Sequence, residues 1–400
     1  MTAGAHLMPA DRDATARLWR AFLLSAVVVM FGAFLFRIPY DFWRLAFEPK
    51  GHSAASDLRF RFVELHAWFA GNPVYGAIES ADYPPASYVI LLPLVGWPTF
   101  EIARLLAVVS MAAALAWLCA LSVRGAGSID RNVRLFALLV PLSMYATTAT
   151  VRIGQLGVYL LAFLLAGILL LAERERTWKS DLLAAVLLAG ALVKPTFSVP
   201  FMWIAFFRGG LRPTILIPGL YVLLTLVAAA FQDASLPMLI QGWLGQSAQV
   251  DFRTGHANVY TWLGMLGLEK HLLAGSILVL LASGLWTWWY RRGDIWILLG
   301  VAAIVARIWS WHHWYDDILL LVPLITLVRM ATVRRSGGRA DWIAMALLGL
   351  IWAFGIAPYE VRNAPPPWGD LFKIAKATTW LATLGLLLVR VRREPSREAC

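Results

Sequence analysis

The sequence predicts an all-α polytopic integral membrane protein. Of its 400 residues, 60% are hydrophobic and only 15% are charged, and the mean hydropathy is +0.67. A soluble domain is typically about 45–50% apolar and about 25% charged. The apolar residues also fall in repeated runs of membrane-spanning length. These observations exclude a soluble enzyme, and the two cysteines exclude a disulfide-stapled secreted scaffold.

About twelve apolar runs predict membrane-spanning helices, because a helix needs about 20 apolar residues to cross the hydrocarbon core. The runs are too long and too continuously apolar for the alternating strands of a barrel. They lie at residues 21–37, 101–122, 134–150, 155–172, 180–194, 196–207, 213–231, 270–290, 294–309, 317–333, 341–357 and 372–390.

The run at 84–97 is short and begins with two prolines, so we interpret it as a surface or re-entrant helix. We therefore expect one transmembrane domain over residues 1–400. Its first extracytoplasmic loop is long, covering residues 38–100, and carries helices that lie at the membrane surface.

The charge distribution predicts the orientation of the chain. The net charge is +11, from 35 Lys and Arg against 24 Asp and Glu. Well over half of the basic residues fall in the short loops on one side, and the positive-inside rule makes that side cytoplasmic. Both termini are then cytoplasmic, in the plasma (inner) membrane. Basic cytoplasmic loops facing anionic headgroups account for the charge, so no nucleic-acid partner is expected.

Ionisable and polar residues on the predicted outer side lie near one depth, at the ends of separate helices. We find no polar ladder through the spans, so this pattern favours chemistry at the outer leaflet over conduction. The candidate site residues are Asp57, Arg59, Tyr83, Arg152, Gln155, Lys194, His256, Asn258, Arg307, His312 and His313.

Two of these residues have competing interpretations. Residues 56–71 alternate between apolar and charged at roughly helical spacing, which is typical of an interfacial helix. Asp57 near its start is either a helix cap or a catalytic base. Lys194, between an apolar run and Pro195, is either a snorkelling side chain or a cation for a phosphate group. No metal is expected at His312-His313, because the sequence lacks HxH or HxxxH spacing.

Several short segments follow one another in a recognisable order. They are Ser56-Asp57-Leu58, Gly71-Asn72-Pro73-Val74-Tyr75, Tyr83-Pro84-Pro85, Gly154-Gln155, Leu192-Val193-Lys194-Pro195-Thr196 and Ser310-Trp311-His312-His313. Each is weak alone, but their order and spacing resemble the family-87 glycosyltransferases, membrane enzymes of the GT-C superfamily.

The resemblance implies a hexosyltransferase that uses a polyprenyl-phosphate sugar, with mannose as the expected sugar. Transfer to a glycolipid or glycan would occur at the extracytoplasmic face with inversion, without metal or cofactor. Asp57 would be the general base. Lys194, Arg152, Arg307, His312 and His313 would bind the donor phosphate, and Gln155, Tyr83, His256, Asn258 and Arg59 the sugar or acceptor.

Two other functions remain as alternatives. A lipid-linked sugar transporter or flippase often has twelve helices, but we find neither an internal repeat nor charge at the membrane midplane. A glycan transferase similar to an O-antigen ligase would be expected to have a large late outer loop. In this sequence the long outer loop is the first one.

Overall fold

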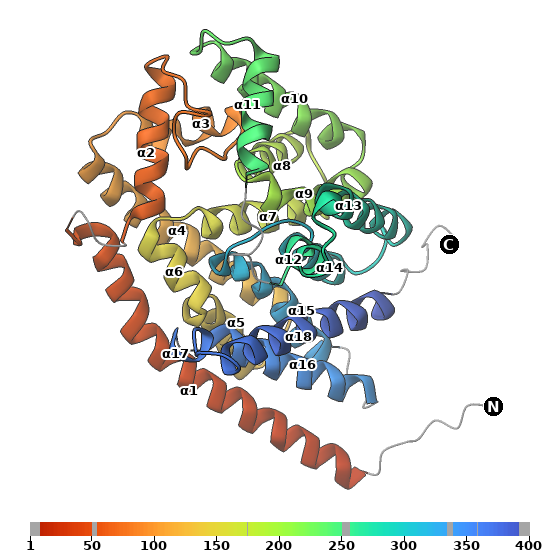
Figure 1. The fold of residues 1–400 in the computed structure, drawn as a ribbon. Coiled ribbons are helices and arrows are strands. Elements are labelled where there is room, and N and C mark those ends of the chain that lie inside the picture. The colour runs from red at the N-terminus through yellow and green to blue at the C-terminus, as the bar shows by residue number, and fades with distance from the viewer. Residues whose placement is uncertain are drawn as a thin grey trace.

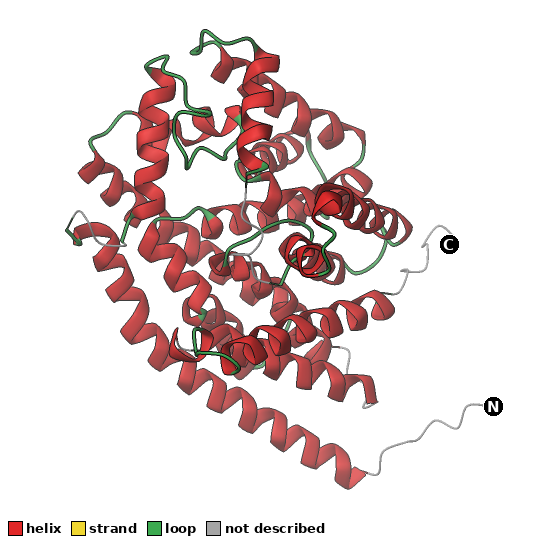
Figure 2. Ribbon diagram, in the orientation of Figure 1, coloured by secondary structure: helices red, strands yellow, loops and turns green. Residues whose placement is uncertain are grey.

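The computed structural model describes residues 9–49, 54–173, 175–249, 257–333, 339–357 and 359–391. Within these ranges the chain forms helices and no strands, so the all-α prediction is confirmed (Figures 1 and 2). The α-helices are α1 (Pro9–Phe47), α2 (Ser56–Phe69), α3 (Pro85–Leu91), α4 (Phe100–Ala126), α5 (Arg131–Ser143), α6 (Tyr145–Ile153), α7 (Gly157–Leu171), α8 (Trp178–Ala191), α9 (Pro195–Gly209), α10 (Leu211–Ala229), α11 (Leu236–Ser247), α12 (Val259–Met265), α13 (Leu272–Trp289), α14 (Ile295–Ile308), α15 (Leu321–Val333), α16 (Arg339–Ile356), α17 (Tyr359–Arg362) and α18 (Trp368–Arg390). Shorter helical turns are η1 (Leu92–Gly96), η3 (Glu269–His271) and η4 (Trp314–Leu320).

Each predicted apolar run contains a helix, but the helices differ in how they relate to a membrane. Among the described residues, five helices are long and apolar enough to cross one: α1, α4, α10, α13 and α18. The α5–α6 pair, bent by 42° at its junction, would make a sixth. The protein is therefore a polytopic membrane protein whose other apolar helices are shorter than a full span.

The short apolar helices α7 and α14 lie inside the bundle. They have 15 and 14 residues, hence lengths of about 21–23 Å against a hydrocarbon core of about 30 Å. Every residue of α14 from Trp296 to Ile308 is buried. A helix that is apolar all round is expected to be covered on all sides. The long helices α10 and α13 instead expose leucines such as Leu223 and Leu278, as expected of a surface that faces lipid.

The first loop folds into a helical layer at one end of the bundle. In Figure 1, α2, α3 and α11 lie together at the end opposite α16 and α18. The predicted helix at 56–71 is confirmed as α2, and the run at 84–97 forms the short helical pair α3–η1. The Trp68 indole donates a hydrogen bond to the Ala228 carbonyl at 2.9 Å, and the Ser87 hydroxyl donates one to the Val193 carbonyl at 2.9 Å. These bonds fix the layer to the end of α10 and to the junction between α8 and α9.

Candidate active site

Asp57 lies in the first turn of α2, which is docked on the end of α6. The residue before the helix is Ala55, whose φ of 56° is left-handed and whose side chain makes no capping bond. Its backbone N–H donates to the Arg152 carbonyl at 2.9 Å. A Cβ on Gly154 would lie 2.7 Å from the Leu58 Cβ, so only glycine permits this close approach. Asp57 is thus not the helix cap, and within the described ranges its carboxylate has no hydrogen-bond partner.

Charges from distant parts of the sequence surround the Asp57 carboxylate. Burial raises the pKa of Asp57 from 3.8 to about 6. The positive charges of Arg61 and Lys194 act to lower this pKa, and the negative charges of Asp82 and Asp316 act to raise it further. Arg61 belongs to α2, Asp82 to the first loop, Lys194 to the α8–α9 junction and Asp316 to η4. The fold therefore assembles four separate chain segments around one carboxylate.

Lys194 and His312 are joined through a buried carboxylate. The Lys194 Nζ donates to both carboxylate oxygens of Asp316, at 2.7 and 2.8 Å. The His312 Nδ1 lies 3.0 Å from Asp316 Oδ2. Burial of Asp316 acts to raise its pKa, but Lys194 and His312 outweigh this effect and hold the pKa below its usual range. Lys194 also lies 5.3 Å from the centre of the Tyr315 ring. Lys194 is therefore held at the site rather than extended to solvent.

The two histidines have different environments. His312 is fully buried, and burial lowers its pKa, so the ring is neutral at pH 7. With a carboxylate beside it, Nδ1 carries the proton, which leaves Nε2 as a hydrogen-bond acceptor. Within the described structure Nε2 has no partner. His313 packs between Trp311 and Tyr315, and burial lowers its pKa to about 4.

A second polar network supports the other side of Asp57. Arg61 lies 2.9 Å from Glu64 and 3.3 Å from Asp82, and it donates to the Ser80 carbonyl at 2.8 Å. Its guanidinium also covers the Tyr83 ring, at 4.0 Å from the ring centre. Tyr83, a predicted site residue, is buried, and Asp57 is among the charges that act on it. The site predicted from the sequence omitted Arg61, Glu64, Asp82 and Asp316. Among these, only Arg61 and Glu64 have a local pattern that indicates an ion pair, because they are three residues apart on one helix.

Arg307 lies behind this cluster in a buried ion pair. Its Nε donates to Asp317 Oδ1 at 2.6 Å, and its side chain is fully buried. The other Asp317 oxygen accepts hydrogen bonds from Lys376, at 2.8 Å, and from the Tyr145 hydroxyl. Asp317 therefore ties α14, α18 and α6 together.

The other predicted residues occupy local structural positions. Gln155 is buried and accepts from the Gly157 N–H at 2.5 Å, at the start of α7. Asn258 caps α12 by accepting from the Thr261 N–H at 2.9 Å. Arg59 lies over the Phe100 ring at 5.3 Å. His256 lies outside the described residues.

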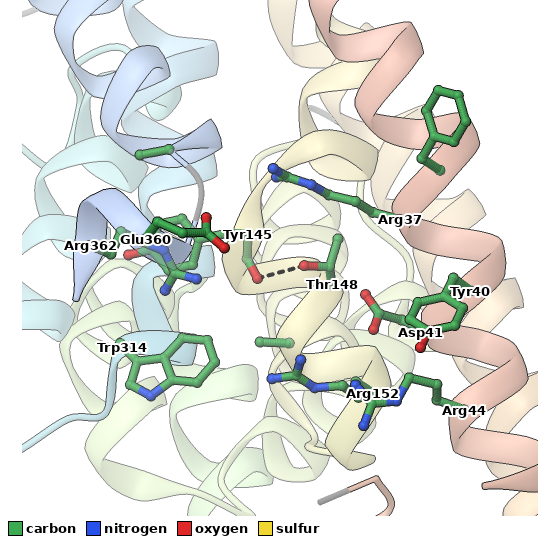
Figure 3. Close-up of a pocket in the computed structure, with 13 residues that line it drawn as sticks. Arg37, Tyr40, Asp41, Arg44, Tyr145, Thr148, Arg152, Trp314, Glu360 and Arg362 are labelled. Atoms are coloured by element: carbon green, nitrogen blue, oxygen red, sulfur yellow. Dashed lines mark hydrogen bonds between the residues drawn. The ribbon is translucent and has the colours of Figure 1, made fainter. Parts of the chain in front are cut away.

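A cavity of about 300 Å³ adjoins the Asp57 cluster between α1, α6 and α17. In Figure 3, Arg37, Asp41 and Arg44 of α1 face Arg152 of α6, while Trp314 and Arg362 line the opposite side. Arg152 thus directs its side chain into this cavity, although its backbone carbonyl binds the start of α2. In the part of the chain that the structure describes, no group of three or more His, Cys, Asp or Glu side chains could hold a metal ion.

Comparison with known proteins assigns the family. The model of glycosyltransferase family 87 matches residues 82–327, more than half of the chain. The matched range includes Lys194, His312 and Asp316, and Asp57 precedes it. No curated protein and no solved structure matches the chain. With a helical membrane bundle and this match, the chain belongs to glycosyltransferase family 87.

Proposed function

We propose that this membrane glycosyltransferase transfers a hexose, with mannose as the expected sugar, from a polyprenyl-phosphate carrier to a glycolipid or glycan acceptor. The reaction would occur with inversion at the extracytoplasmic face of the inner (plasma) membrane, with both termini in the cytoplasm. The observation that carries the proposal is the convergence of Asp57, Lys194, Asp316 and His312 from separate segments. Family membership supports the reaction class.

Asp57 is the general base of this proposal. A sugar hydroxyl is a poor nucleophile, and a positioned base typically contributes about 10²–10⁴-fold to such a step. A carboxylate with a pKa near 6 is ionised at neutral pH and more basic than an ordinary aspartate. It takes the acceptor proton while the acceptor oxygen bonds to the sugar anomeric carbon. The bond between that carbon and the phosphate oxygen breaks, and the phosphate leaves with the electron pair. A single displacement of this kind inverts the anomeric centre.

Lys194 and the histidines supply groups for the leaving phosphate and the sugar. An ammonium group has three N–H donors, and the two Asp316 contacts leave one for a phosphate oxygen. Fixed cations stabilise charge that develops on a leaving group. The His312 Nε2, which has no partner among the described residues, would accept a hydrogen bond from a sugar hydroxyl. Tyr83 and Arg59 would contact the acceptor. The positions of Gln155, Asn258 and Arg307 favour support of these groups over direct contact.

The test is a transfer assay with purified protein and a panel of polyprenyl-phosphate sugars, scored by release of free polyprenyl phosphate. We expect release with one hexose donor and an acceptor, and no transfer of labelled sugar to that acceptor from the corresponding nucleotide sugars. Asp57→Asn should abolish release, and Asp370→Asn, at an exposed position of α18, serves as the matched control. No release from any polyprenyl-phosphate sugar, or equal release by Asp57→Asn, would contradict the proposal.

A further inference from the structure

The loop at residues 76–82 is held to α11 by hydrogen bonds from side chains to backbone. This loop runs between α2 and α3, which lie together with α11 at one end of the bundle (Figure 1). The Gln246 side chain accepts from the Gly76 N–H at 3.1 Å. It also donates to the Glu79 carbonyl at 2.9 Å and to the Ile78 carbonyl at 3.4 Å. One side-chain amide therefore binds three backbone groups of the loop.

The end of the same loop is also held by α11. The Trp243 indole and the Ser247 hydroxyl both donate to the Asp82 carbonyl, at 3.0 and 3.3 Å. Gly242 lies directly against Tyr75, since a Cβ on this glycine would be only 3.1 Å from the Tyr75 Cβ. Residues at this spacing lie on one face of a helix. One face of α11 therefore contacts the loop along its length.

The loop in turn holds Arg61 beside Asp57. The Arg61 guanidinium donates to the Ser80 carbonyl at 2.8 Å and lies 3.3 Å from the Asp82 carboxylate. The Ser80 hydroxyl donates at 2.7 Å to Glu64, which is the other ion-pair partner of Arg61. Asp57 and Arg61 are four residues apart on α2, so their side chains share one face of that helix. The position of the loop therefore decides which partners Arg61 has next to Asp57.

We propose that Gln246 of α11 is a positioning residue for the general base. It acts on Asp57 through the loop at 76–82 and through Arg61. In the described structure every hydrogen bond of the Gln246 side chain goes to this loop, so its substitution affects the loop first. The proposal rests on the proposed function for the role of Asp57 as base.

Loosening the loop changes the surroundings of Asp57 in a single direction. Burial is the largest cause of its pKa of about 6, and the Asp82 carboxylate raises this pKa further. A loosened loop exposes this side of the site to water and moves the Asp82 carboxylate away. It also frees Arg61 from two acceptors, so that its positive charge acts more strongly on Asp57. All three changes lower the pKa of Asp57 toward its ordinary value of 3.8.

The other ionisable groups that act on Asp57 lie outside the loop. They are Glu64 on α2, Tyr83 before α3, Lys194 at the α8–α9 junction, and Tyr315 and Asp316 on η4. Glu64 keeps its pairing with Arg61, at 2.9 Å, because both belong to α2. Lys194 and Asp316 pair with each other. Burial raises the pKa of both tyrosines, so they stay neutral at neutral pH. The Arg152 side chain of α6 points into the neighbouring cavity.

The first test is the pH dependence of transfer by full-length protein, with the polyprenyl-phosphate hexose that gives release in the panel assay. We expect Gln246→Leu to move the acid limb of kcat/KM downward by about one pH unit. At pH 8 this variant should lose about three- to tenfold in kcat/KM, because a less basic carboxylate is a weaker general base. The loss should be smaller at pH 5. Gln241→Leu, at an exposed position of the same helix, should match the wild type.

A second variant loosens the loop by a different route. Trp243→Phe combined with Ser247→Ala removes both hydrogen bonds to the Asp82 carbonyl and keeps an aromatic ring on α11. It should move the acid limb in the same direction, and it decides the question if Gln246→Leu fails to fold. A profile that keeps the wild-type midpoint overturns the proposal even if activity is lower at every pH, because structural damage alone does not change the pKa of the base.

A stability measurement separates this proposal from the proposed function. Asp57→Asn should raise the unfolding temperature at pH 8, because the pKa of Asp57 is raised in the folded protein. This gain should be smaller when Gln246→Leu is also present, and an equal gain in both backgrounds overturns the positioning role. If the wild type releases no polyprenyl phosphate from any donor but the gain is smaller with Gln246→Leu, the proposed function fails and the control of Asp57 by Gln246 stands.

Discussion

The Lys194 ammonium lies within 2.8 Å of both carboxylate oxygens of Asp316, although 122 positions separate the two residues. This pair joins the start of α9 to η4, and Asp316 is almost fully buried. Removing one member of a buried ion pair leaves the other charge uncompensated and typically costs about 3–5 kcal/mol.

A double-mutant cycle tests the strength of this pair. We expect Asp316→Asn and Lys194→Met each to lower the thermal unfolding temperature in detergent. The double variant should lose less stability than the sum of the single variants, because it leaves neither charge alone. Additive losses would show that the two side chains are not coupled in the folded protein.

The rate of transfer should depend on pH through Asp57. Its pKa is about 6, and only the ionised carboxylate accepts a proton. We therefore expect kcat/KM to be level above about pH 7 and to fall about tenfold per pH unit well below pH 6. Asp57→Asn should lower kcat/KM by about 100-fold or more at pH 8, and its remaining activity should not show the wild-type fall below pH 6. A wild-type profile that stays level down to pH 4.5 would contradict the role as base.

Asp57 should also lower the stability of the protein at neutral pH. Because its pKa is raised in the folded state, folding disfavours the ionised form, and stability is lost as the pH rises through about 6. Asp57→Asn should therefore unfold at a higher temperature than the wild type at pH 8. This advantage should shrink between pH 6 and the ordinary value of 3.8. The exposed variant Asp370→Asn should show no such dependence.

Substitutions of Arg307 and of Lys194 should have different effects on stability and on the KM for the lipid donor. Arg307→Met breaks the buried pair with Asp317, so its main effect should be a lower unfolding temperature. Lys194→Met, at the partly exposed position, should in addition raise the KM for the lipid donor. An Arg307→Met protein with normal stability but a tenfold higher donor KM would place Arg307 at the phosphate, as predicted from the sequence.

Cysteine labelling tests the predicted orientation. In a background without Cys119 and Cys400, Glu79→Cys in the first loop should react with a membrane-impermeant reagent added to intact cells. Ile129→Cys, at a residue that is 99% exposed between α4 and α5, should react only after the membrane is opened. The reverse pattern would place Asp57 in the cytoplasm and contradict the proposed location of the reaction.

The helices were predictable from the sequence because long apolar runs have few other stable arrangements in lipid. The positions at which these helices break were not predictable. The run at 134–150 is one apolar stretch in the sequence, yet extended backbone at Met144 separates α5 from α6. A bend of 42° there leaves hydrophobic periodicity almost unchanged, so composition does not indicate it.

The site was predictable in part. Asp57, Lys194 and His312 were selected from the sequence and lie in one cluster. Asp316 was not selected, because its role depends on partners contributed by other segments. The sequence also does not distinguish Asp316 from its neighbour Asp317, although one faces Lys194 and the other pairs with Arg307. Burial and long-range pairing decide this difference, and neither leaves a local pattern.

The distribution of the site along the chain has a consequence for biogenesis. Asp57 is synthesised early, whereas Lys194 follows near the middle of the 400 residues and Asp316 only after more than three quarters of them. The bonds that hold α2 and α3 in place, to Ala228 and Val193, can form only once those later residues have been made. A nascent or truncated chain would therefore carry the carboxylate without its surroundings. We therefore expect a chain to become active in sugar transfer only after the ribosome has passed the segment that contains Asp316.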